Sequence, residues 1–120
     1  MARMLIADDA LFVRRVLGEI AESAGHEIVA EAATGYEAVR RFTELRPDVV
    51  VLDVNMPELD GISAAEAIRQ LEPDVGIVLA SVLLTPDRAR RVEQLGVFVQ
   101  KPCDRAELLA AVEAVAPVPA

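Results

Sequence analysis

Hydrophobic and polar positions form regular blocks along this chain. Short apolar segments rich in β-branched residues predict five strands, at residues 3–7, 27–32, 48–52, 75–80 and 97–100. Between them, apolar residues recur three and four positions apart, as in helices that bury one face. These residues are Val13, Val16, Leu17, Ile20 and Ala24, then Ala38, Val39, Phe42 and Leu45, then Ala65, Ile68 and Leu71. The pattern therefore alternates strand and helix along the whole chain.

The spacing of the predicted strands fixes how they pair. Successive strands start more than 20 residues apart, so hairpins are excluded and crossover connections are required. Right-handed crossovers place helices on both faces of a parallel sheet, which explains why residues 48–52 and 75–80 are apolar throughout. The expected fold is α/β, a flavodoxin-like doubly wound five-stranded parallel sheet of order 2-1-3-4-5 with five helices. We expect one domain over residues 1–117, followed at 118–120 by a tail or linker stump.

Composition and charge narrow the function classes. A chain of 120 residues with 53% hydrophobic content is long enough to bury a core. Twenty acidic residues against twelve basic ones give a net charge of -8, which disfavours direct binding to nucleic acids or to anionic membranes. A single cysteine, Cys103, allows no internal disulfide, and no apolar run approaches the roughly 20 residues of a membrane span. We expect a cytoplasmic protein.

Polar side chains stand where the predicted strands end. Asp8 and Asp9 follow the first strand and Asp53 follows the third, and these two strands are neighbours in the expected sheet. The three carboxylates should therefore converge. Two unit charges about 4 Å apart repel by roughly 4 kcal/mol at an effective dielectric near 20, so a cation is needed. Carboxylate oxygens without histidine or cysteine nearby favour Mg²⁺.

Two further strand ends complete the candidate site. Lys101, the only lysine beside eleven arginines, follows the fifth strand, and Ser81 ends the fourth. An ammonium and a hydroxyl opposite a carboxylate cluster suit an incoming anion such as a phosphoryl group, with Asp53 as the nucleophile. Each residue taken alone has an ordinary interpretation as a helix cap, a turn residue or a surface charge. Their joint position at four strand ends favours a site for phosphoryl transfer.

These residues, together with the segment DVNMPELDG around Asp53, resemble a bacterial two-component response-regulator receiver domain over essentially the whole chain. The segment DDALFVRR and Asn55 are similar to those of the single-domain, CheY-like members. The resemblance implies that Asp53 accepts a phosphoryl group from a sensor histidine kinase, a phosphotransfer protein or a small donor such as acetyl phosphate. It further implies that Asp9, Asp53 and the backbone carbonyl of Asn55 bind Mg²⁺ directly, with Asp8 acting mainly through water.

The resemblance also implies a conformational switch. Lys101 and Ser81 would hold the phosphoryl oxygens, the Lys101–Pro102 bond is of a kind usually found cis, and Phe98 occupies the position of the switch aromatic. Phosphorylation would then alter the surface of the fourth helix, fifth strand and fifth helix, which controls a downstream protein effector or a covalently linked output domain. Such a protein is not an enzyme, apart from catalysing its own phosphoryl transfer and autodephosphorylation.

Departures from the family pattern keep two alternatives open. The chain is about two residues short between Gly96 and Phe98, and Val82 stands where a small residue is usual. These features would suit a receiver-like interaction module that is not phosphorylated. A Mg²⁺-dependent small-molecule phosphohydrolase of the haloacid-dehalogenase type is the other alternative, although such enzymes carry an aspartate where this chain has Asn55. The apolar loop Val82-Leu83-Leu84 is either a partner contact or a tightened loop packed on its own core.

Overall fold

A five-stranded parallel sheet lies at the centre of the computed structural model, which describes residues 1–117. The elements in chain order are β1 (Arg3–Ala7), α1 (Leu11–Ser23), β2 (Glu27–Ala32), α2 (Gly35–Leu45), β3 (Val49–Asp53), α3 (Gly61–Leu71), β4 (Gly76–Ser81), α4 (Pro86–Leu95), β5 (Val97–Gln100) and α5 (Arg105–Val115). The expected tail at 118–120 lies outside the described residues. Within residues 1–117, no helix has the length and apolar character of a membrane span.

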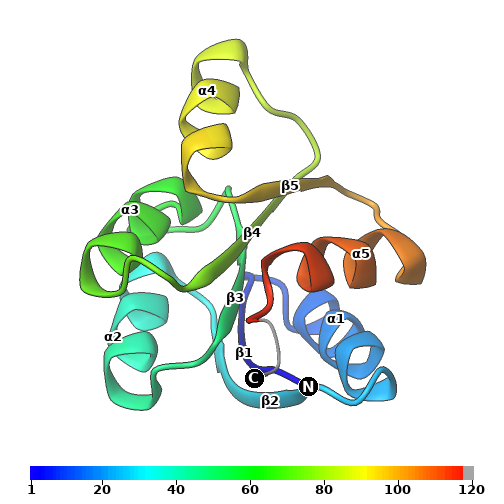
Figure 1. The fold of residues 1–120 in the computed structure, drawn as a ribbon. Helices are drawn as coiled ribbons and strands as arrows, with labels where there is room; N and C mark the ends of the chain where they lie inside the picture. The colour runs from blue at the N-terminus through cyan, green and yellow to red at the C-terminus, as the bar shows by residue number, and fades with distance from the viewer. Residues whose placement is uncertain (118–120) are drawn as a thin grey trace.

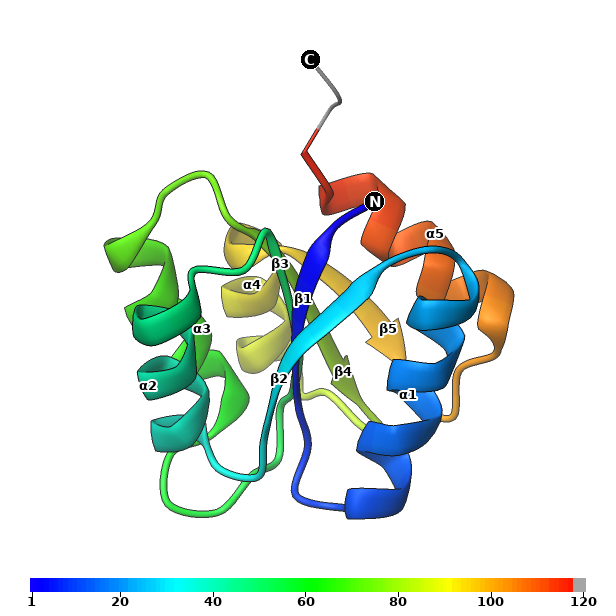
Figure 2. The same cartoon turned by 90° about the horizontal axis from the view of Figure 1, so that it is seen from below.

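The strand order is β2-β1-β3-β4-β5, and every neighbouring pair is parallel, so the predicted flavodoxin-like topology is confirmed. Figures 1 and 2 show α1 and α5 on one face of the sheet and α2, α3 and α4 on the other. Because all strands run in the same direction, their carboxyl ends lie along one edge of the sheet. That edge receives the side chains that follow the strands.

Alternate residues of each strand enter two separate cores. In β1, Met4 and Ile6 pack with α1 and α5, whereas Leu5 and Ala7 pack with α2, α3 and α4. All five residues of β3 and all six of β4 are buried, because both faces of these central strands are covered. The uninterrupted apolar runs in the sequence thus follow from a sheet that lies between two layers of helices.

Some sequence-based details were wrong by one residue or one helical position. β3 and β4 each begin and end one residue later than predicted, so Asp53 and Ser81 belong to the strands themselves. In α1 the buried positions are Leu17, Gly18 and Ala21, whereas Val16 is 38% exposed and Ala24 lies beyond the helix. The apolar spacing predicted the helix and the packing of Val13, Leu17 and Ile20 correctly, but it wrongly included the exposed Val16 and Ala24 in the buried face.

The shortened segment before Phe98 has a direct structural solution. α4 ends at Leu95 and β5 begins at Val97, so Gly96 alone joins them. A Cβ atom at position 96 would lie 2.1 Å from the carbonyl oxygen of Ile77 in the adjacent strand β4. Glycine therefore lets the chain pass directly from helix to strand with no loop, against the backbone of the sheet.

Candidate functional site

Three carboxylates meet at the carboxyl edge of the sheet. Asp8 and Asp9 follow β1, and Asp53 is the last residue of the neighbouring strand β3. One oxygen from each can be chosen so that all three lie within 4.8 Å of one another. Asp8 and Asp53 are buried, at 1% and 7% exposed, whereas Asp9 is exposed. The structure thus brings together the three acids that the strand ends indicated.

Lys101 reaches this cluster from the end of β5. Its ammonium forms a short ion pair with Asp8 and lies 3.3 Å from the Asp53 carboxylate oxygen Oδ1. The second oxygen of Asp8 accepts a hydrogen bond from the backbone N–H of Ala10, 2.9 Å away. The peptide bond between Lys101 and Pro102 is cis. One cation therefore bridges two buried carboxylates that come from different strands.

The pKa values of the buried groups follow from this arrangement. Burial raises the pKa of Asp53 and the charge of Asp8 raises it further, so the opposing attraction of Lys101 does not restore the ordinary value. For Lys101, burial acts to lower the pKa, but its hydrogen bond to Asp8 and the charges of Asp53 and Asp8 together outweigh burial and raise it. Lys101 is thus held as a cation beside a carboxylate that resists ionisation.

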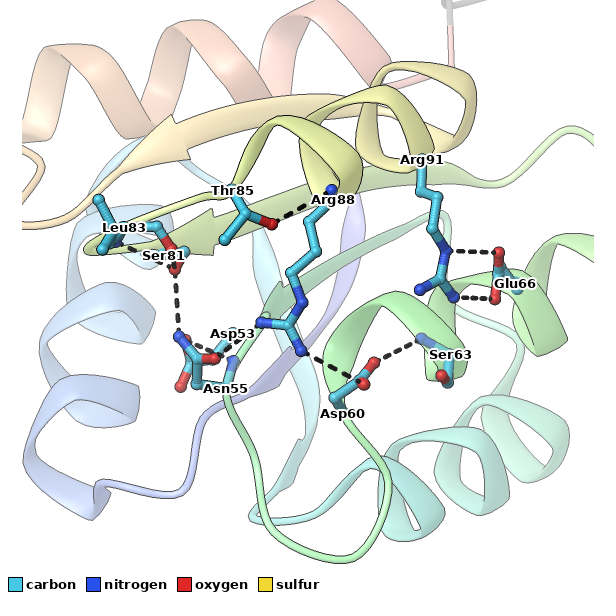
Figure 3. A network of polar contacts seen from close by, with 10 residues as sticks. All are labelled: Asp53, Asn55, Asp60, Ser63, Glu66, Ser81, Leu83, Thr85, Arg88 and Arg91. Carbon is cyan, nitrogen blue, oxygen red and sulfur yellow. Dashed lines mark hydrogen bonds and ion pairs between the residues drawn. The ribbon is translucent and has the colours of Figure 1, made fainter.

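Ser81 and Asn55 form the side of the site that faces α4 (Figure 3). Ser81 is fully buried, and its hydroxyl donates to the carbonyl oxygen of Leu83 at 2.8 Å. The same hydroxyl accepts from the side-chain amide of Asn55 at 3.2 Å and from the backbone N–H of Leu83 at 3.3 Å. The backbone N–H of Asn55 lies 3.4 Å from Oδ1 of Asp53. Ser81 is thus next to the acid cluster but engaged with other partners.

Gly61 keeps the loop after Asp53 close to the end of β3. A Cβ atom at position 61 would lie 2.0 Å from the carbonyl oxygen of Asp53, and the backbone N–H of Gly61 donates to the carbonyl of Val54 at 2.9 Å. Asp60 caps α3 by accepting from the backbone N–H of Ser63 at 2.8 Å. The segment that carries Asn55 is therefore fixed at both ends.

Comparison with known proteins agrees with this geometry. The family model for the response regulator receiver domain matches residues 4–113. The chain belongs to this family. A chemotaxis protein CheY of Bacillus subtilis is 37% identical over 112 residues, covering 92% of this chain and 93% of the relative. Another CheY, from Thermotoga maritima, is 43% identical over 81 residues, which is 68% of each chain.

Solved structures give the same result for the receiver fold. A CheX-CheY-BeF3-Mg complex from Borrelia burgdorferi matches with a TM-score of 0.88 at 32% identity, covering 94% of this chain and 87% of that one. A LuxR-family two-component response regulator from Aurantimonas matches with a TM-score of 0.87 at 35% identity, covering 96% and 84%. The chain is thus a CheY-like receiver domain of the two-component response-regulator class.

The acid cluster of this receiver domain fits a divalent cation. Its potential ligands are oxygens from three carboxylates, the donor type that Mg²⁺ prefers, and the exposed side of Asp9 leaves room for water. Lys101 compensates only part of the negative charge of three ionised carboxylates. A divalent ion would neutralise the remainder and would favour ionised Asp53. The donor chemistry and the charge imbalance therefore both suit Mg²⁺.

Sequence reasoning missed one residue that contacts the site. Arg88, in the first turn of α4, donates from Nη1 to the Asn55 side-chain oxygen at 3.1 Å, and its Nη2 lies 3.7 Å from the Asp60 carboxylate. The sequence holds only part of this signal: Thr85 and Pro86 are a typical N-cap and first-turn proline, and the helix that begins there places Arg88 near the site. Which way a long side chain turns from that position depends on tertiary packing.

An apolar groove lies beside the acid cluster, between α1, α5 and the sheet. Its volume is about 310 Å³, and it is lined by residues including Phe12, Val16, Val82, Lys101, Pro102 and Cys103. Phe12 is 79% exposed and Val82 is 65% exposed. Leu83 is also exposed, whereas Leu84 packs against the core that includes α4. In the apolar loop after Ser81, Leu84 thus packs on the protein's own core, whereas Val82 and Leu83 are exposed and remain candidates for a partner contact.

Proposed function

We propose that residues 1–117 form a receiver domain that acts as a phosphorylation-activated signalling switch, with Asp53 as the phosphoacceptor. One observation carries the proposal: the buried Asp53 carboxylate lies 3.3 Å from the Lys101 ammonium, and one of its oxygens lies within 4.8 Å of oxygens from two further carboxylates, close enough for one metal ion to bind all three. A carboxylate nucleophile, a fixed cation and a candidate Mg²⁺ site at one point are the parts that phosphoryl transfer requires. No simpler structural role needs all three.

The chemistry assigns a task to each side chain. A carboxylate oxygen of Asp53 attacks the phosphorus of the donor, and the bond from phosphorus to the donor histidine nitrogen, or to the acetate oxygen of acetyl phosphate, breaks with its electron pair leaving on the donor. Lys101 pairs with the transferred phosphoryl oxygens, and Ser81 donates a hydrogen bond to one of them. Asp9, Asp53 and the backbone carbonyl of Asn55, with Asp8 in a supporting role, would hold Mg²⁺, which would supply charge neutralisation.

The transferred group changes the local balance of hydrogen bonds. Phosphorylation replaces the single charge of the Asp53 carboxylate with one of about −1.5 to −2 and brings three acceptor oxygens, which draw the Ser81 hydroxyl away from Leu83. Phe98, half-buried against the core that contains Val92 and Leu95 of α4, can then move toward the space that Ser81 leaves. The surface formed by α4, β5 and α5 changes as a result, and a downstream effector or a linked output domain responds to it.

The phosphodonor protein, a sensor histidine kinase or a phosphotransfer protein, docks beside the apolar groove. The groove is continuous with the site because Lys101 and Pro102 line it, and Phe12 and Val82 offer exposed apolar contacts next to them. A small donor such as acetyl phosphate does not need this surface. Phe12→Ser should therefore slow transfer from a protein donor while leaving labelling by acetyl phosphate unchanged.

Intact-mass measurement after incubation with acetyl phosphate tests the proposed function. The wild-type protein should gain one phosphoryl group in the presence of Mg²⁺ and none with EDTA, and Asp53→Asn should gain none in either case. If the wild type gains no mass even with a kinase supplied, the chain is instead an interaction module that is not phosphorylated. Turnover of free phosphoesters in excess of protein would support the phosphohydrolase alternative.

A further inference from the structure

Arg88 connects α4 to the loop that follows Asp53. Its guanidinium donates to the side-chain oxygen of Asn55 at 3.1 Å and lies 3.7 Å from the carboxylate of Asp60 (Figure 3). The Arg88 side chain is about one-third exposed, and its guanidinium cannot lose its proton, so it is a donor at every working pH. The residue extends from the first turn of the helix, and its backbone N–H donates to the side chain of the Thr85 cap. A cation on a weakly packed helix is therefore attached to the residue two positions after the phosphoacceptor.

The contact with Arg88 determines which end of the Asn55 amide faces Ser81. A guanidinium has donors and no acceptor, so only the amide oxygen can face it. The amide NH₂ is then directed to the other side, where it donates to the Ser81 hydroxyl at 3.2 Å. Without Arg88, either end of the amide could face the serine. Arg88 thus fixes the orientation of the Asn55 amide directly and, through this amide, the orientation of the Ser81 hydroxyl, which Arg88 does not touch.

The hydrogen bonds of Ser81 are fully used in this arrangement. A hydroxyl has one donor and two acceptor positions. The donor goes to the carbonyl of Leu83, and the acceptor positions take the Asn55 amide and the Leu83 backbone N–H. Because the Asn55 NH₂ can only donate, the serine proton has no acceptor on that side and stays on Leu83. Ser81 must break this set before it can donate to a phosphoryl oxygen on Asp53.

We propose that Arg88 is a positioning residue that acts through Asn55 to hold the Ser81 hydroxyl in its unphosphorylated arrangement. This inference rests on the proposed function and adds that Arg88 opposes the movement of Ser81 toward a phosphoryl group. Arg88 belongs to α4, so the same contact that restrains Ser81 also docks the helix whose surface is read by a partner. Rearrangement at Ser81 and release of the α4 N-terminus are then two results of breaking one network.

The weak packing of α4 makes such a contact influential. Only Val92 and Leu95 of this helix are buried, and both lie in its second half. The N-terminal half is attached to the rest of the molecule through Arg88, and further along the helix Arg91 forms a two-bonded ion pair with Glu66 of α3. Arg91 joins α4 to α3 and not to the loop after Asp53, and it has no contact with Asn55 or Ser81 among the described residues. It provides a matched control.

Binding of beryllofluoride with Mg²⁺, which mimics a phosphoryl group on an aspartate, tests the proposal. Arg88→Met keeps the aliphatic side chain and removes the donors, so it should lower the cost of the rearrangement and tighten binding about three- to tenfold. Arg91→Met should bind like the wild type. In a Ser81→Ala background, the effect of Arg88→Met should vanish, because the hydroxyl that it restrains is gone.

Two outcomes overturn the inference while leaving the proposed function intact. If Arg88→Met binds beryllofluoride more weakly, Arg88 assists the bound anion instead of restraining the free state. If binding is unchanged, or changes equally in both Ser81 backgrounds, Arg88 does not act through Ser81. If the wild type binds no beryllofluoride at all, the proposed function fails.

NMR spectra of the free protein then still test the contact between Arg88 and Asn55. The side-chain amide signal of Asn55 should shift in Arg88→Met and not in Arg91→Met, and an unchanged signal in Arg88→Met would overturn the inference.

Discussion

The environment of Asp53 favours the neutral carboxyl group. Burial raises its pKa above the ordinary value of 3.8, Asp8 raises it further, and Lys101 opposes both without cancelling them. The native state therefore holds this proton to a higher pH than the unfolded chain does. The contribution of this group to the free energy of unfolding declines as the pH rises from 3.8 through the native pKa of Asp53. Above the native pKa, that contribution is fully lost. The group that performs the proposed chemistry thus destabilises the metal-free fold at neutral pH.

Asp53→Asn should consequently stabilise the protein at neutral pH in the absence of metal. Asparagine has nearly the same shape as the protonated acid, and Lys101 keeps its ion pair with Asp8. Urea unfolding in EDTA should give a larger free energy of unfolding for the variant than for the wild type above the native pKa. The difference should disappear below pH 3.8, where both states of the wild type are protonated. A variant that is less stable at pH 7 would mean that the attraction of Lys101 outweighs burial.

The elements that the sequence predicted well are those whose pattern depends on burial. β3 is apolar because both faces are covered, and the order of strands and helices followed from that pattern. The positions of Asp8, Asp53 and Lys101 also followed, since the ends of parallel strands must share one edge. The end of β3 was predicted one residue too early, because an aspartate such as Asp53 is as typical of the first residue of a turn as of the last paired residue of a strand.

Other parts of the site depend on contacts that a single sequence does not encode locally. The network of Arg88, Asn55 and Asp60 requires a particular rotamer of a long side chain over a distance of 33 residues in the chain. The exposure of Val16 depends on the rotation of α1 against the sheet, which apolar spacing leaves uncertain by one position.

The direct junction between α4 and β5 gives a prediction about a single element. In Gly96→Ala the new methyl group would lie 2.1 Å from the carbonyl oxygen of Ile77. Neither this backbone oxygen nor the Cα atom that carries the methyl group can move without disturbing the sheet. We expect a loss of roughly 1–3 kcal/mol in the free energy of unfolding. Gly18→Ala in α1 is the control, because its methyl group would meet only side-chain carbons at 3.7 and 3.9 Å.

The control should behave in the opposite way. Gly18 lies within a helix, where alanine is favoured over glycine by about 1 kcal/mol, so Gly18→Ala should be neutral or stabilising. Chemical unfolding of both variants beside the wild type measures the difference. Equal stability of Gly96→Ala and the wild type would show that the junction has room to adjust, and the two-residue shortening would then impose no constraint on α4.

At the scale of the molecule, the two cores and the site have separate tasks. The cores on the two faces of the sheet hold the strands in register, and this brings together Asp53, the last residue of β3, with Asp8 and Lys101, each the first residue beyond its strand. Only Val92 and Leu95 of α4 are buried, and polar contacts of Arg88 and Arg91 supply further attachment that is less costly to rearrange. A rigid sheet edge beside a loosely attached helix suits a protein in which a local charge change alters one surface.

Mg²⁺ should stabilise the whole fold through the acid cluster. A ligand that binds only the native state adds RT ln(1 + [L]/Kd), which is about 1.4 kcal/mol at ten times Kd, or roughly 4–8 °C in Tm for a domain of this size. Thermal unfolding of the wild type should show this rise. NaCl at matched ionic strength is the control, because salt also raises the Tm of a protein with a net charge of -8 by screening its charge repulsion, without binding at the site. Asp53→Asn loses one carboxylate and should show a smaller rise. An equal rise in both proteins would place the cation away from Asp53, and it would remove the charge neutralisation on which the proposed phosphoryl transfer depends.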